Sequence, residues 1–176
     1  MREGCLLTLA LIVCAAASAD HDRVKAAGCY IATERGVVMT IGRFNGELQL
    51  PAGTREPGES PACTARRETL EETGLIVQVA ERVGARKGGR FVLFRCIPEK
   101  RLDVAGDFKP LDFFEIREVL VLNPSTLLDV DGVRIERPWR FPQDRPLLTA
   151  LFSAGEPAAP EIRAGLDCAG GQRDAG

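Results

Sequence analysis

Histidine, tyrosine and tryptophan are nearly absent from this 176-residue chain, which has one residue of each type. The histidine is His21, and none of the six cysteines forms a CxxC pair. Because zinc sites draw their ligands from clustered cysteines and histidines, these shortages argue against a zinc site. Net charge is also small, since 23 Lys and Arg stand against 25 Asp and Glu. No overall basic field is therefore present to recruit a nucleic acid polymer.

Long apolar runs are missing too, apart from the first residues. Arg2 precedes an apolar stretch over Cys5–Ala17, and Ala17–Ala19 forms a small-residue cleavage pattern. This order is typical of a secretory signal peptide, and the stretch is too short to span a bilayer easily. We expect a signal peptide over 1–19 with cleavage after Ala19, a periplasmic or secreted protein, and no stable membrane span after cleavage. An uncleaved anchor and a buried core helix are the alternatives.

Export would leave four cysteines and place them in an oxidising compartment, where disulfides form. They are Cys29, Cys63, Cys96 and Cys168. Cys29 and Cys96 both lie in segments that have the pattern of strands. The sequence leaves two interpretations open, a Cys29–Cys96 disulfide or two buried free thiols.

The chain after residue 19 alternates strand patterns with turn signals. We expect a hairpin that turns at Glu34–Gly36 and a short strand at Leu48–Leu50. Further strands are expected in the segments LIVQVAERVGA, GRFVLFRCIPE and FFEIREVLVLN. A short helix should span Arg145–Phe152, and the Ala-, Gly- and Pro-rich segment 153–176 reads as a disordered tail. These elements predict an α+β fold with a mixed β-sheet.

The best-marked element is a helix expected over Pro61–Thr73. Ser60 is a favourable N-cap, proline at the first helical position loses no hydrogen bond, and Gly74 supplies a left-handed stop. The face that packs on the sheet should be carried by Ala65, Thr69 and Leu70. The glutamates of the helix are expected on another face.

Three of these glutamates, Glu68, Glu71 and Glu72, occupy positions i, i+3 and i+4. Like charges at such spacings destabilise a helix by about 0.2–0.5 kcal/mol per pair. A solvated helix surface is one interpretation. A Gly/Pro-rich loop before the helix, the shared face, and the further acid Glu59 favour a bound cation instead.

A hard divalent cation such as Mg²⁺ takes oxygen ligands and keeps waters and phosphates in its shell. Glu71 and Glu72 would anchor it, and Glu68 lies one turn away as a base for an attacking water. Arg67 would orient one of these carboxylates. The pattern therefore predicts metal-assisted hydrolysis of a phosphorus–oxygen bond.

The same segment resembles the Nudix box, G-x5-E-x7-R-E-U-x-E-E-x-G-U, in which U is a bulky apolar residue. Thr69 at the first U is the single departure. The matching residues are Gly53, Glu59, Arg67, Glu68, Glu71, Glu72, Gly74 and Leu75. The resemblance implies an α+β fold of the Nudix type, an α/β/α sandwich with a mixed sheet, in a Nudix hydrolase domain over 20–152.

The resemblance also implies roles for the box residues. Box glutamates in this family hold Mg²⁺ or Mn²⁺, so Glu71 and Glu72 would be metal ligands and Glu68 a ligand or the base. Arg67 would orient Glu68. Glu59 would support the metal shell.

Residues outside the helix would complete this site. The carbonyl of Ala52, just before the box, would offer another oxygen to the metal. Many members add an acid from a later strand or loop, and Glu118 is the first candidate here, with Glu115 second. An exposed strand carboxylate is the alternative for Glu118.

The implied reaction is attack of a metal-activated water on a diphosphate in a nucleoside diphosphate-X or a related small molecule. Arg86, Lys87 and Arg90 would bind the substrate, although a solvated hairpin loop fits them as well. Trp139 and Phe141 either stack on a base or pack on the sheet. The alternatives for the whole chain are a non-hydrolytic ligand-binding module and a cytosolic or membrane-anchored nucleotide-cleansing hydrolase.

Two subfamilies lack support in the sequence. No proline stands at the distance after the box that ADP-ribose pyrophosphatases commonly show. Tyr30 is the only tyrosine, so the downstream tyrosine of dinucleoside polyphosphate hydrolases is missing. The sequence therefore leaves the substrate open.

Overall fold

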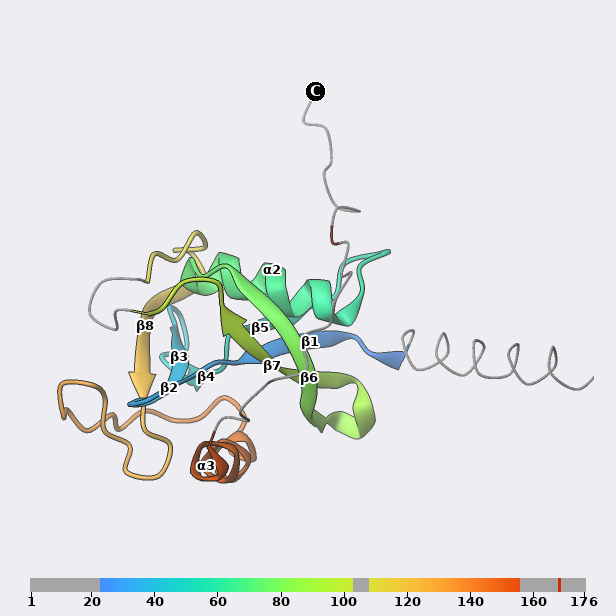
Figure 1. Ribbon diagram of the computed structural model, residues 1–176. Coiled ribbons are helices and arrows are strands. Elements are labelled where there is room, and N and C mark those ends of the chain that lie inside the picture. The colour runs from blue at the N-terminus through green and yellow to red at the C-terminus, as the bar shows by residue number, and fades with distance from the viewer. Residues whose placement is uncertain (1–22, 103–107, 156–167, 169–176) are drawn as a thin grey trace, which may run out of the picture.

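The computed structural model describes residues 23–102, 108–155 and 168. Within this part of the chain, strands form the middle of the molecule and two α-helices lie on opposite sides of them (Figure 1). The expected signal peptide lies outside the described residues. So does most of the expected tail, over 156–167 and 169–176.

The helices and strands come in an order that begins with five strands. The strands are β1 (Ala26–Tyr30), β2 (Ala32–Thr33), β3 (Gly36–Gly42), β4 (Leu48–Gln49), β5 (Ala52–Thr54), β6 (Val77–Arg86), β7 (Phe91–Pro98) and β8 (Ile116–Leu122). The helices are α2 (Pro61–Thr73), the short 3₁₀ turn η1 (Lys87–Gly89) and α3 (Asp144–Ala154).

The strands form two four-stranded sheets. One has the order β5-β1-β7-β6, in which β1 and β7 run parallel and the other pairs are antiparallel. In the other sheet, β2, β4 and β8 all pair antiparallel to β3. The predicted α+β class with a mixed sheet is therefore confirmed.

The first hairpin differs from the prediction in one respect. Its turn at Glu34–Arg35 is where the sequence places it, and β2 pairs with β3. However, the single strand expected before the turn is divided after Tyr30, and β1 belongs to the other sheet. The segment Ala52–Thr54, expected as loop, is the edge strand β5. Gly28 of β1 permits this pairing, because a Cβ there would overlap Ala52.

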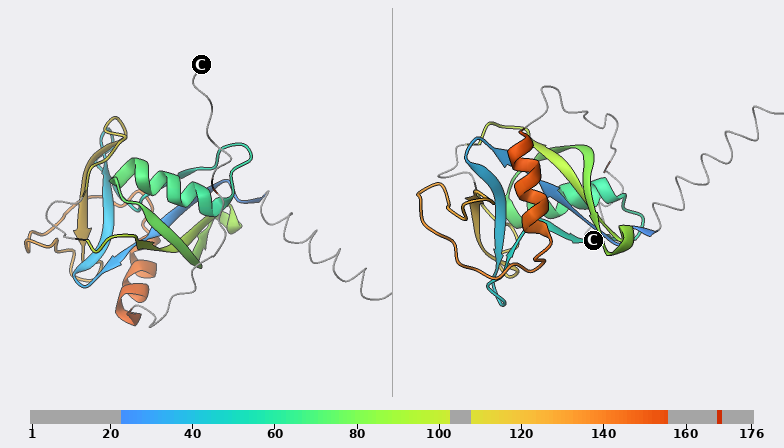
Figure 2. Two further views of the ribbon diagram at one scale, coloured as in Figure 1. Left: turned by 45° about the horizontal axis from the view of Figure 1, so that its top comes forward. Right: turned by 90° about the horizontal axis from the view of Figure 1, so that it is seen from below.

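Side-chain alternation along β7 divides the core into two layers. Val92, Phe94 and Cys96 face the layer under α2, while Phe91 and Leu93 face the layer under α3. Successive strand residues point to opposite faces of a sheet, so one strand supplies both layers. In the view from below, α3 lies across the strands on the side opposite α2 (Figure 2). This arrangement is the expected α/β/α sandwich.

Helix α2 has the predicted bounds. The Ser60 hydroxyl accepts from the backbone N–H of Cys63 at 3.2 Å, and Gly74 ends the helix at φ 77°. The packing face is partly different from the prediction. Leu70 is only half-buried, whereas Glu72 is 3% exposed. Glu72 is buried because its carboxylate reaches the backbone of β5, which also lies against the helix.

The structure joins Cys29 to Cys96 and Cys63 to Cys168 by disulfides. The first links β1 to β7 in the layer under α2. The second, which the sequence does not predict, links the first turn of α2 to the C-terminal segment. Helix α3 extends through Ala154, so the expected tail begins later than residue 153. Among the described residues, no helix is both long enough and apolar enough to cross a membrane.

Candidate active site

The guanidinium of Arg67 lies among the acids of α2. Its Nε is 3.0 Å from Glu59 Oε1, and its Nη1 is 2.9 Å from both Glu68 Oε1 and Glu71 Oε2. Its Nη2 donates to the carbonyl of Thr54 at 3.0 Å. Arg67 therefore ties three carboxylates to β5, and it contacts Glu68, the residue that it is expected to orient.

Glu59 acts as the anchor of Arg67. It also accepts from the Thr64 hydroxyl at 2.9 Å and from the backbone N–H of Glu56 at 3.1 Å. Burial opposes its charge, but the hydrogen bonds from Arg67 and Glu56 bring the pKa of Glu59 below its usual value. Burial likewise opposes the charge of Arg67, and Glu59 and Glu68 nevertheless raise its pKa. The oxygens of Glu59 are therefore engaged by Arg67, Thr64 and the Glu56 N–H, and Arg67 links Glu59 to Glu68 and Glu71.

Glu68 lies against the backbone of β5. Its side chain is 13% exposed, and a Cβ at position 53 would overlap its carboxylate. Burial raises the pKa of Glu68; Arg67 opposes this shift, and the charges of Glu71 and Glu115 add to it. A carboxylate with a raised pKa is a suitable general base near neutral pH.

Glu72 is the most buried of the acids, and its Oε2 accepts from the backbone N–H of Ala52 at 2.9 Å. Burial raises the pKa of Glu72 to about 8; the Ala52 N–H opposes this, and the charges of Glu68 and Glu115 reinforce it. Ala52 thus contacts Glu72 through its N–H, whereas the predicted contribution of Ala52 is its carbonyl oxygen as a metal ligand. A buried carboxylate of this kind ionises readily only if a cation joins it.

The donor set of α2 fits a hard divalent cation. Glu71 has a 42% exposed side chain, Glu68 lies beside it, and Glu72 is the buried acid that a cation would stabilise in its charged form. Among the described residues, no three acidic, cysteine or histidine side chains already form a metal cage. On this helix, Arg67 forms ion pairs with Glu68 and Glu71.

Of the two later acids, the structure brings Glu115 to the box and not Glu118. The charge of Glu115 raises the pKa of both Glu68 and Glu72. Glu118 is not among the charges that act on them; its carboxylate is 51% exposed and 3.8 Å from Arg117. Glu118 is thus an exposed carboxylate on a strand, which is the alternative given for it from the sequence. Of the two, Glu115 is therefore the acid whose charge acts on the box.

A pocket of about 390 Å³ adjoins these acids. Ala52 and Gly53 form part of its wall, and the same two residues contact Glu72 and Glu68 from the other side. Five of the lining residues are cationic, and none is acidic. The cations are Lys25, Arg86, Lys87, Arg90 and Arg140.

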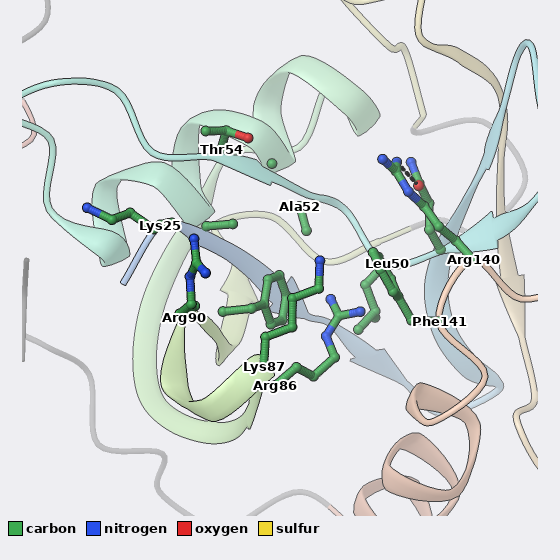
Figure 3. A pocket seen from close by; sticks show the side chains of 13 residues that line it. Lys25, Leu50, Ala52, Thr54, Arg86, Lys87, Arg90, Arg140 and Phe141 are labelled. Carbon is green, nitrogen blue, oxygen red and sulfur yellow. Dashed lines mark hydrogen bonds between the residues drawn. The ribbon is translucent and has the colours of Figure 1, made fainter. Parts of the chain in front are cut away.

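The three predicted substrate-binding residues lie together in this pocket. Figure 3 shows the charged ends of Arg86, Lys87 and Arg90 pointing toward the segment that carries Ala52. They come from the end of β6, from η1 and from the residue before β7. The hairpin between these strands is therefore a wall of the pocket, although a solvated loop was the alternative interpretation.

The two aromatic candidates are separated by the structure. Phe141 lines the pocket, while Trp139 packs against the core layer under α3 and pairs with Leu48. Sequence reasoning missed two further cations of the pocket, Lys25 and Arg140. Arg140 donates to the Gln49 side chain at 2.6 Å, a contact across 91 residues that has no local sequence signal.

The comparison with protein families agrees with the box and the sandwich. A family model described as the NUDIX domain matches residues 22–144. The chain belongs to the Nudix family. The segment that matches the family model begins before β1 and ends at the start of α3.

Two curated relatives have names from this family. An RNA pyrophosphohydrolase of Erythrobacter litoralis (strain HTCC2594) is 35% identical over 74 residues, which are 38% of this chain and 45% of that protein. A MutT-like protein of Streptomyces ambofaciens is 38% identical over 88 residues, or 47% of this chain and 56% of that protein. This Nudix chain thus aligns with about half the length of each relative.

Solved structures resemble the fold as well. An ADP-ribose pyrophosphatase from Streptococcus suis 89-1591 superposes with a TM-score of 0.57 over 76% of this chain and 92% of that one. The two chains are 18% identical. At this identity the likeness shows the Nudix fold and nothing finer.

Proposed function

We propose that this Nudix protein hydrolyses a diphosphate bond in a nucleoside diphosphate-X or a related small molecule, with Mg²⁺ or Mn²⁺. One observation carries the proposal. The backbone of Ala52 and Gly53 has the acids of α2 on one side and the cationic pocket on the other. Because β5 is the edge strand of its sheet, a phosphate chain bound in the pocket would reach the carboxylates by passing this edge.

The residues take the following roles. Glu71 and Glu72 would hold the cation, and Glu115 adds charge from the loop before β8. When bound, the divalent cation stabilises negative charge on the phosphate oxygens and makes a coordinated water acidic. Glu68 would accept a proton from the attacking water, and Arg67 holds Glu68 in place.

The cationic wall supports a small anionic substrate. Lys87 and Arg90 line the pocket and offer charged donors to phosphate oxygens. Hydrogen bonds between charged partners are stronger than neutral ones. One relative is named an RNA pyrophosphohydrolase, so a short RNA with a 5′-triphosphate is the alternative substrate to test. The net charge of −2 favours a small-molecule substrate over RNA.

We also propose that the protein works outside the cytosol. The support is the order of charged, apolar and small residues over 1–19. Cell fractionation with sequencing of the mature N-terminus tests it. An intact N-terminus in the membrane fraction would instead favour the uncleaved anchor.

The deciding experiment is a hydrolysis screen of the purified protein with Mg²⁺ and with Mn²⁺. The panel should contain nucleoside triphosphates, nucleotide sugars, dinucleoside polyphosphates, NAD, ADP-ribose, prenyl diphosphates and the triphosphate RNA. Glu71→Gln and Glu72→Gln should each lower kcat by orders of magnitude on the best substrate. Glu34→Gln, in the exposed turn before β3, is the matched control and should behave as wild type. If the wild type hydrolyses none of these compounds, a ligand-binding module would be favoured.

A further inference from the structure

The segment 111–115, which brings Glu115 to the acids of α2, is not anchored by its apolar side chains. Leu111 is 61% exposed, Phe113 59% and Phe114 68%, so none of the three is buried in the core. An apolar side chain that stays in water gains no free energy from burial. The position of Glu115 therefore depends on the hydrogen bonds that hold the backbone of this segment.

One set of these hydrogen bonds joins the segment to α2 and closes its own turn. The N–H groups of Leu111 and Asp112 donate to the carbonyl of Glu71, near the C-terminal end of α2. The Asp112 carboxylate accepts from the N–H groups of Phe114 and Glu115, at 3.1 and 2.9 Å. These bonds use N–H groups of the segment, and they leave the carbonyls around Glu115 for another partner.

That partner is Arg43, the residue that follows β3. Its backbone N–H donates to the carbonyl of Glu115 at 2.7 Å. Its side chain reaches two neighbouring carbonyls, since Nη2 donates to that of Ile116 at 3.3 Å and Nε donates to that of Phe113. One arginine thus holds the backbone at Glu115 and on both sides of it. Because the donors of a guanidinium lie in one rigid plane, the two side-chain bonds fix the direction of the segment as well as its place.

A β-bulge in β8 sets which residue lies opposite Arg43. The pairing of β3 with β8 shifts by one residue between Ile41 and Gly42, so that Gly42 pairs with Ile116. Without the shift, Ile116 would lie opposite Arg43; with it, Glu115 does. Bulges re-aim side chains and are frequent beside active sites. The extra residue of β8 therefore brings the acid, and not its apolar neighbour, to the residue that holds it.

We propose that Arg43 is a positioning residue of the active site, which holds Glu115 at the acids of α2. This inference rests on the proposed hydrolysis and adds the group that orders its loop acid. The charge of Glu115 acts on Glu68 and Glu72, and such an interaction weakens as the distance between charges grows. A residue that fixes Glu115 therefore also fixes part of the negative charge that a divalent cation meets.

The variant Arg43→Met removes both side-chain hydrogen bonds and keeps the backbone N–H. The affinity for Mg²⁺ and for Mn²⁺, measured by calorimetry without substrate, should fall by about 10-fold or more, as is usual when a group that orients a metal ligand is lost. On the best substrate of the screen, kcat should fall by about 10- to 100-fold. KM should stay nearly unchanged, because Arg43 holds the loop and not the substrate.

Arg35→Met is the matched control, at the other end of β3. The Arg35 guanidinium donates to the carbonyl of Val130, 95 residues away, which is the same kind of contact between a side chain and a distant loop backbone. In urea unfolding, the two variants should lose stability to a similar extent. Only Arg43→Met should lower kcat and the affinity for metal, whereas a purely structural arginine would behave as Arg35 does.

Arg43→Lys separates position from charge. Lysine keeps the positive charge, but its single nitrogen atom cannot serve two carbonyls in the way that the planar fork of arginine does. If Arg43 positions the segment, this variant should recover only part of the lost kcat. If Arg43 instead attracts the substrate through its charge, Arg43→Lys should behave as wild type, and that result refutes the proposal.

A double-mutant cycle tests the link to Glu115. Glu115→Gln should lower the affinity for Mg²⁺ by itself, and Arg43→Met should add little in the same chain, because both changes act through one carboxylate. Additive losses would mean that Arg43 acts on another group. An unchanged affinity in Glu115→Gln would mean that Arg43 holds no acid of the metal site. Either result refutes the proposal.

The two proposals fail on different results. If the wild type hydrolyses no compound of the screen, the proposed function fails, while the metal affinities of the variants still test Arg43. If the wild type is active and Arg43→Met keeps both its kcat and its metal affinity, the hydrolase stands and the role of Arg43 is refuted.

Discussion

Gly53 and Glu68 lie so close that no side chain fits between them. A Cβ at position 53 of β5 would overlap the carboxylate at the end of the Glu68 side chain. Gly53 is not among the glycines with positive φ, so its backbone could accept alanine. The glycine is required at this position for space, and the group that would move is the expected general base.

We therefore expect Gly53→Ala to impair catalysis more than folding. The alanine methyl would push the Glu68 carboxylate away from the attacking water, and a misplacement of about 1 Å can cost about 100-fold in rate. The melting temperature should change little, because the end of a flexible side chain moves rather than backbone. Steady-state kinetics and calorimetric melting measure the two effects.

A double-mutant cycle provides the control for this variant. In a Glu68→Gln background, Gly53→Ala should cause little further loss, since both changes act on the same group. Additive losses would mean that Gly53 acts through something other than Glu68.

Helix α2 shows how far local sequence signals reach. Ser60, Pro61 and Gly74 mark both ends of the helix in a way that depends only on neighbouring residues, and the observed bounds agree with them. The burial of Glu72 is not predictable from the helix alone, because it depends on Ala52, twenty residues away, whose N–H is placed at the carboxylate by the pairing of β5 with β1.

Gly74 is expected to be needed for stability rather than for chemistry. It has φ 77°, and a Cβ there would also overlap the backbone carbonyl of Lys109. Gly58 has a similar φ of 80° but nothing within 4 Å, which makes it a matched control. Alanine at either position costs about 1–2 kcal/mol for the left-handed backbone. Gly74→Ala should cost clearly more than Gly58→Ala in denaturant unfolding, and equal costs would show that the Lys109 contact is unimportant.

The pair Glu115 and Glu118 gives a direct test of the site. Glu115→Gln should lower kcat, and it should weaken Mg²⁺ binding, because its charge acts on Glu68 and Glu72. Glu118→Gln should leave both unchanged, since its carboxylate is exposed beside Arg117. Kinetics over a Mg²⁺ titration measure both quantities. The reverse result would restore Glu118 as the acid of the site.

The sequence could not order these two acids, because their order depends on a loop. The backbone N–H groups of Leu111 and Asp112 donate to the carbonyl of Glu71 at 2.8 and 2.9 Å, which holds the loop on the end of α2. The N–H of Glu115 then donates to the Asp112 carboxylate at 2.9 Å. The contacts with Glu71 join segments about forty residues apart. The alternation of apolar and polar residues near residue 118 therefore cannot predict them.

The Cys29–Cys96 disulfide should add to stability. It closes a loop of 67 residues, and cross-linking a loop of that length is expected to contribute about 4 kcal/mol. Cys29→Ala/Cys96→Ala should therefore lower the free energy of unfolding measured by urea, and the difference should largely vanish in a reductant. Alkylation of the native protein without a reductant should label neither cysteine, and labelling at both would show free thiols.

Glu72 makes the stability of the metal-free protein depend on pH. Its pKa is about 8 in the folded protein and near 4.5 in the unfolded chain. Between these values the folded state holds a proton that the unfolded chain has released, so stability falls as pH rises through this window. The full cost, on the order of a few kcal/mol, is present above pH 8. Glu72→Gln keeps an acceptor for the Ala52 N–H, and its stability should not fall in this pH window.

Urea unfolding in EDTA from pH 5 to pH 9 measures this effect as the stability of Glu72→Gln minus that of the wild type. The difference should be near zero at pH 5 and should grow toward pH 9. With saturating Mg²⁺ at pH 8 the order should reverse, because a bound cation stabilises the ionised carboxylate of the wild type and finds one ligand fewer in the variant. A difference that stays constant with pH, or that ignores Mg²⁺, would mean that Glu72 is neither a buried titrating acid nor a metal ligand.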